Sequence, residues 1–84
     1  MRDITLNRDD SVETVLPLVE EAMESGEICR IRNIDYLGRL GIASLRLLSM
    51  ANNLLDTSTG RMFRPRPGFC LLAIDSSGKD RKLN

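Results

Sequence analysis

A helical pattern that ends at a glycine and passes at once into a strand pattern is the feature that most constrains this chain. Six apolar residues from Val12 to Met23 recur at helical spacing on one narrow arc, and glutamates occupy the opposite side. Gly26 closes this segment, because glycine accepts the left-handed conformation that ends a helix. From Glu27 to Ile34 the pattern changes to the alternation of a strand. A one-sided helix joined so closely to a strand predicts helices layered on a sheet.

The start of this helix and the remaining elements follow from similar local signals. Asp10 with Glu13 three residues later predicts an N-cap and capping box. Pro17 removes one backbone hydrogen bond and predicts a kink, or else a division into two shorter helices. The other predicted elements are a strand at Ile4–Leu6, a turn at Asp35–Gly38, a helix from about Arg39 to Leu55, a loop from Asp56 to Gly68, a buried central strand at Phe69–Ile74 and the stub of a further strand from Lys79.

We therefore predict a two-layer α/β (α+β) domain of order β-α-β-α-β(-β), with two helices on one face of a small mixed sheet. The 84 residues have room for a single hydrophobic core, so residues 1–84 form one domain. Apolar residues cover about half of the predicted second helix, which calls for two packing partners. The second partner is expected to be another copy of the chain, with Ile42, Leu45 and Met50 at the interface of a homodimer.

The composition removes several classes of function. The chain has no histidine and two cysteines, which excludes Ser-His-Asp and Cys-His catalysis and the common zinc sites. It has no glycine-rich phosphate loop, so we expect no enzyme, metal or cofactor. Cys29 and Cys70 fall in predicted strands, where packed free thiols are expected. The charged N-terminus and the short Phe69–Ile74 run predict a cytoplasmic protein without a membrane partner.

The charge is divided unevenly along the chain. Residues 1–60 hold six arginines against ten acidic residues, whereas residues 61–84 hold six basic residues against two aspartates. The second part predicts a phosphate-binding arm, although a merely solvated surface is the alternative. Phe63 lies among its arginines and could stack on a base. The candidate nucleic-acid-binding residues are Arg61, Phe63, Arg64, Arg66, Lys79, Arg81 and Lys82, assisted by Arg8 and by Arg39 at the head of the second helix.

Two regions of the chain resemble the Alba superfamily, specifically its stage V sporulation protein S type. They are Glu27–Ile31 leading into Gly38-Arg39 and Ala43–Ala51, and Ala73–Asp75 followed by Gly78–Lys82. The resemblance covers the element order of nearly the whole chain and rests on hydrophobic rhythm rather than on a catalytic motif. It implies a dimer that binds DNA or RNA through basic loop residues and a hairpin arm.

Two functions therefore compete. The first is sequence-nonspecific binding of DNA or RNA, which the charge division and the resemblance favour. The alternative is a protein-protein interaction or assembly module that binds no nucleic acid and uses the apolar second helix and the acidic first helix. The zero net charge and the acidic pair Asp9-Asp10 in the first loop favour this alternative.

Overall fold

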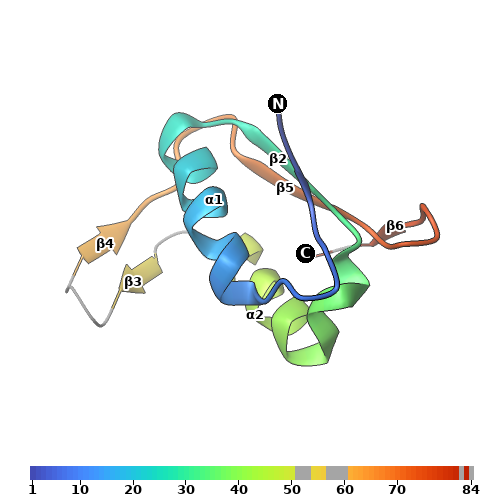
Figure 1. Cartoon of the computed structure of the whole chain (residues 1–84). Coiled ribbons are helices and arrows are strands. Elements are labelled where there is room, and N and C mark those ends of the chain that lie inside the picture. Colours follow the sequence, from blue (N-terminus) through green and yellow to red (C-terminus); the bar gives the residue numbers. More distant parts are fainter. Residues whose placement is uncertain (51–53, 57–60, 82, 84) are drawn as a thin grey trace.

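Two helices cover one face of a four-stranded sheet in the computed structural model of the chain (Figure 1). The structure describes residues 1–50, 54–56, 61–81 and 83, and of residues 49–50, 54–56 and 61–63 it describes the backbone alone. The elements are β1 (Arg2–Thr5), α1 (Val12–Ser25), β2 (Ile28–Arg32), the 3₁₀ helix η1 (Ile34–Leu37), α2 (Gly38–Met50), β3 (Leu54–Asp56), β4 (Arg61–Phe63), β5 (Cys70–Ile74) and β6 (Asp80–Arg81). The predicted two-layer α/β architecture is confirmed.

The sheet is mixed, as the pattern predicts. Its strand order is β1-β2-β5-β6, in which β1, β2 and β5 run parallel and β6 returns antiparallel to β5. Ile4 lies beside Ile31, which lies beside Ala73. The parallel strands are joined through α1 and α2, and β6 is the predicted stub of a further strand.

The core lies between the helices and the inner face of the sheet. In β2 and β5 every second residue points into it, which places Cys29, Ile31, Leu71 and Ala73 among the buried residues. The helices meet them with a stripe that is fully or almost fully buried. Its residues are Val15, Val19, Ala22 and Met23 of α1 and Leu45 and Leu48 of α2.

Both ends of α1 are capped, the N-terminus by Ser11 and Thr14 and the C-terminus by Gly26. Ser11 is the N-cap and its backbone N–H donates to Thr14 Oγ1 at 3.5 Å, so the predicted Asp10–Glu13 capping box is wrong. Asp10 instead accepts a hydrogen bond from the Asn7 backbone at 2.7 Å, which closes the turn before the helix. Gly26 has the predicted left-handed conformation, at φ 68°. A single helix spans Pro17, so the division into two helices is not observed.

The segment after α2 differs from the prediction. α2 ends at Met50, whereas the pattern predicts a helix to Leu55, and the predicted loop contains a strand. β3 and β4 pair as a separate antiparallel hairpin, with Leu55 beside Met62, and this hairpin projects from the body of the domain (Figure 1). Leu54 and Leu55 fit the apolar spacing of a helix as well as that of a short strand. Strands of three residues are too short to show an alternating pattern in the sequence.

β5 is central in the sheet but is not buried on both of its faces. Cys70 and Leu72 are exposed while Leu71 and Ala73 are buried, so the prediction of a strand covered on both faces is wrong for the outer face. The reason is that α1 and α2 lie on the same side of the sheet (Figure 1).

None of the helices among the described residues is long and apolar enough to cross a membrane.

Candidate functional site

The outer face of the sheet carries aligned columns of different chemistry. β5 contributes an apolar column of Cys70, Leu72 and Ile74. Beside it, β2 contributes Arg30 and Arg32 above the apolar Ile28, so this column is mostly basic. β1 and β6 place one aspartate each on the two outer sides, Asp3 beside Arg30 and Asp80 beside Ile74. We call these eight residues the outer-face site.

A charge network holds the basic column in place. The Arg30 guanidinium donates two hydrogen bonds to Asp3, at 2.7 and 2.8 Å, in a bidentate arrangement. Arg32 approaches the same carboxylate less closely, at 3.7 Å. The hydrogen bonds from Arg30 lower the pKa of Asp3, and those same contacts raise the pKa of Arg30. Two guanidinium groups therefore share one carboxylate, and Arg32 has the longer contact.

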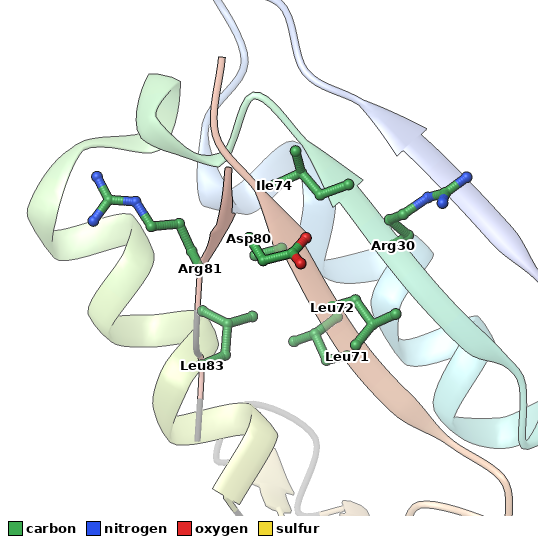
Figure 2. Close-up of a pocket in the computed structure, with 8 residues that line it drawn as sticks. Arg30, Leu71, Leu72, Ile74, Asp80, Arg81 and Leu83 are labelled. Atoms are coloured by element: carbon green, nitrogen blue, oxygen red, sulfur yellow. The ribbon is translucent and has the colours of Figure 1, made fainter. Parts of the chain in front are cut away.

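A hollow of about 310 Å³ opens beside Leu72 (Figure 2). Figure 2 shows Asp80 directed toward β5 and Arg81 directed away from it toward α2, with Leu83 between that helix and β5. The hollow is lined by Arg30, Leu71, Leu72, Ala73, Ile74, Asp80, Arg81 and Leu83. Its floor is apolar and its charged groups lie at the margin, a lining typical of binding pockets.

A second exposed apolar surface lies on α2. Leu40 is 86 % exposed and Leu47, two turns further along, is 68 % exposed. The exposed small residues Ala43 and Ser44 lie between them on the same face. The Ser44 hydroxyl donates to the Leu40 carbonyl at 2.9 Å, which satisfies its donor within the helix. We call Leu40, Ala43, Ser44 and Leu47 the α2 stripe.

The residues predicted for the homodimer interface lie beside this stripe rather than on it. Leu45 is 0 % exposed and packs in the core of its own chain, so its assignment to an interface is corrected. Ile42 is half-buried against the core, and the side chain of Met50 lies outside the described part of the chain. The sequence shows that apolar residues cover about half of the circumference of α2. It does not show which of these residues pack in the core of the same chain.

The candidate nucleic-acid-binding residues do not form one patch. Arg64 and Arg66 precede β5, and the Arg66 backbone bonds to Met23 at the end of α1. Lys79 lies in the turn beyond the other end of β5, whose five residues span roughly 16 Å. Figure 1 places the β3–β4 hairpin and β6 at opposite ends of the molecule. The side chains of Arg61, Phe63 and Lys82 lie outside the described residues.

The other predicted cations gather at the edge where the parallel strands end. Arg8 stacks over the Tyr36 ring at 5.6 Å from its centroid. Arg39 lies in the first turn of α2, close in sequence to Tyr36, and is exposed. Arg81 forms an ion pair with Asp75 at 3.3 Å. We call Arg8, Arg39 and Lys79 the strand-end cations.

Aspartates in the same loops tie this edge together. Asp35 accepts two hydrogen bonds at 2.7 Å, from the backbone N–H and the hydroxyl of Ser76, which joins η1 to the turn after β5. Asp75 accepts from Ser77 and from the Lys79 backbone within that turn. These bonds lower the pKa of both carboxyl groups. Their role in the described structure is to fix two loops.

The two cysteines have opposite environments. Cys29 is buried, and burial raises the pKa of its thiol to about 11. Cys70 is exposed on the outer face, so the prediction of two packed thiols is wrong for Cys70. Both are free thiols, and because Cys70 lies beside Ile28 rather than Cys29 in the register, the two point to opposite faces.

No family model, curated protein or solved structure matches this chain. The resemblance to the Alba superfamily therefore stays a prediction. Within the described residues, no three cysteine, aspartate or glutamate side chains are grouped so as to hold a metal ion. The described residues thus offer two apolar surfaces, a set of arginines engaged by carboxylates, and the three exposed strand-end cations.

Proposed function

We propose that this protein is a protein-protein interaction module that assembles through α2. The observation that supports it best is the exposure of Leu40 and Leu47 on one face of that helix. Large apolar side chains grouped on a surface are typical of interaction sites, whereas single exposed ones are ordinary. The predicted homodimer is retained in this proposal, with the α2 stripe at its centre.

The shape of the α2 stripe is self-complementary. Leu47 follows Leu40 by seven positions, about two helical turns, so both lie on one helix face with Ala43 and Ser44 between them. When a second α2 packs antiparallel about a two-fold axis near Ala43 and Ser44, each Leu40 meets the partner's stripe near its Leu47. The small residues let the helix axes approach to about 8–10 Å. A two-fold contact of this kind uses the same patch on both copies.

The engagement of three arginines, of which Arg81 is a nucleic-acid-binding candidate, supports assembly over nucleic-acid binding at those positions. Arg30 pairs with Asp3, Arg81 with Asp75, and Arg2 with both Glu21 and Glu27. A guanidinium that already holds a carboxylate gains less from a phosphate, because the first contact must be broken or shared. The zero net charge of the chain adds no overall attraction to a polyanion.

The test is sedimentation velocity of the wild-type chain and of a Leu40→Asp/Leu47→Asp variant over a range of concentrations. We expect a dimer for the wild type and at least a tenfold weaker association for the variant, because each aspartate would be desolvated at the contact. Leu18→Asp is the matched control, since Leu18 is an exposed leucine on α1. A wild-type monomer at all concentrations, or a variant that associates like the wild type, would contradict the proposal.

A second candidate function, binding of DNA or RNA, rests on the strand-end cations. Arg8 and Lys79 lie in loops at the edge where the parallel strands end, Arg39 lies in the first turn of α2 at that edge, and all three are exposed. Fluorescence anisotropy of labelled duplexes at low and moderate salt would test it. Binding that weakens with salt and falls in an Arg39→Ala/Lys79→Ala variant is expected under this function, while no binding at low salt leaves assembly alone.

A further inference from the structure

We infer that the outer-face site binds a second copy of this chain, sheet against sheet, about a two-fold axis that runs along β5. This inference rests on the proposed assembly function but uses a different surface from the α2 stripe. Its first support is that both helices lie on the other side, so alternate side chains of β2 and β5 are open to contact.

The strand order makes this face complementary to itself. β2 and β6 flank β5 on its two sides, one strand spacing away in each direction. A two-fold axis along β5 therefore places β2 of one copy over β6 of the other. The rotation leaves the position along the strand unchanged, so residues in one row of the sheet face partner residues in the same row.

The charges in that row are opposite. Arg32 lies beside Ile74, and Ile74 lies beside Asp80, so all three belong to one row. In the face-to-face pair, Arg32 of each copy faces Asp80 of the other. An arginine and an aspartate together span the roughly 10 Å between packed sheets. Arg32 is suited to this contact because its own approach to Asp3 is the long one, at 3.7 Å.

The apolar column fills the space between the two ion pairs. Leu72, which is 43 % exposed, lies on the axis and faces the Leu72 of the partner copy. Leu72 also lines the floor of the 310 Å³ hollow, together with Leu71 and Ile74. Figure 2 shows this floor between Arg30 and Asp80. Leu72 and Ile74, which lie on the axis, are thus covered by their own counterparts, and Arg32 of each copy meets Asp80 of the other.

The area sets the expected strength. β2 and β5 are five residues long, β1 four and β6 two, so with strands about 4.8 Å apart the face measures at most roughly 14 by 16 Å. Interfaces smaller than about 1,200 Å² in total are weak. We therefore expect a weak dimer with a dissociation constant of roughly tens to hundreds of micromolar.

A charge exchange tests the inference, made in the Leu40→Asp/Leu47→Asp background so that the helix contact does not contribute. Sedimentation equilibrium up to about 1 mM should show residual dimerisation in this background. Arg32→Glu alone and Asp80→Arg alone should each raise the dissociation constant about tenfold, because each places like charges opposite one another. The combined Arg32→Glu/Asp80→Arg variant should return to within about threefold of the background. Lys79→Glu, outside the outer-face site, is the control and should change nothing.

Three outcomes would overturn the inference: no dimerisation in the background, single variants that associate as the background does, or a double variant that is not restored. Leu72→Asp in the wild-type background gives an independent measure, since it should remove the weak association and leave the α2 dimer intact. If instead the α2 variants change nothing while Leu72→Asp abolishes association, the helix contact fails and the sheet contact stands. Circular dichroism of each variant verifies folding.

Discussion

The inner and outer faces of the sheet are built from alternate residues of the same two strands, β2 and β5, yet only the inner face is buried. On the inner face, Ile31 and Leu71 are buried beneath the helices. On the outer face, Ile28 and Leu72 have comparable side chains and remain substantially exposed. In β5, where apolar side chains point to both faces, the side on which the helices pack therefore decides which of them are buried. The inner face holds the fold together, while the outer face is left available for contact.

The largest effect is expected from truncating an isoleucine on each face in turn. Ile31→Ala should lower the free energy of unfolding by about 2–5 kcal/mol, because it leaves a cavity in a packed core. Ile28→Ala should change it by no more than about 0.5 kcal/mol, as for other surface substitutions. Urea unfolding of both variants at low protein concentration measures the difference. Equal losses would mean that the outer face is covered within a single chain.

Thiol labelling should separate the faces next. Cys70 is exposed and Cys29 is buried, with the pKa of its thiol raised by burial to about 11 from 9.0. At pH 8 the raised pKa alone reduces the Cys29 thiolate fraction about 100-fold, and the reagent must also reach the core. Labelling with a chromogenic disulfide should modify one thiol quickly and the second only on unfolding. A Cys70→Ser variant should lose the fast phase.

The smallest effect is expected from the charge network on the outer face. The pKa of Asp3 is lowered in the folded protein, chiefly by its hydrogen bonds from Arg30. A group with a lowered pKa stabilises the fold above its ordinary value, here 3.8, and loses that stabilisation as the pH falls through the folded value. Asp3→Asn should therefore reduce the melting temperature slightly near neutral pH and flatten its decline below about pH 4. Asp9→Asn, in an exposed loop, is the control; the same flattening there would contradict the assignment.

The fold was largely predictable because its signals are local. Periodicity identified α1, β2 and β5 and the order of strands and helices, and Gly26 marked the end of α1 through its conformational freedom. The hairpin of β3 and β4 was missed because three-residue strands carry too few residues for a period, and the pairing of Leu54 with Phe63 joins residues nine apart. The N-cap was missed because Asp10 and Ser11 are both suitable capping residues.

The candidate site was less predictable, since it depends on which residues share an edge or a face in space. Arg66 and Lys79 belong to one basic segment of sequence, but β5 runs between them and carries them to opposite ends of the sheet. Arg32 and Asp80 are far apart in sequence, yet the pairing of β2, β5 and β6 places them in one row. The alternation in β2 did indicate that Arg30 and Arg32 share an outer face. No feature of β5 showed that Leu72 would lie beside them exposed.

The amino-acid pattern alone thus predicted the main elements other than β3 and β4, and the two-layer arrangement with both helices on one face of the sheet. It could do so because a helix or a strand with one apolar face must bury that face, and the period of the apolar residues identifies each element. The packing of α2 against the core decided that Leu45 turns inward and Leu40 outward, and the pairing of β2, β5 and β6 decided which side chains share the outer face. Burial of an apolar residue is not directional, so a chain with more apolar faces than one core can cover leaves the choice of exposed face to packing.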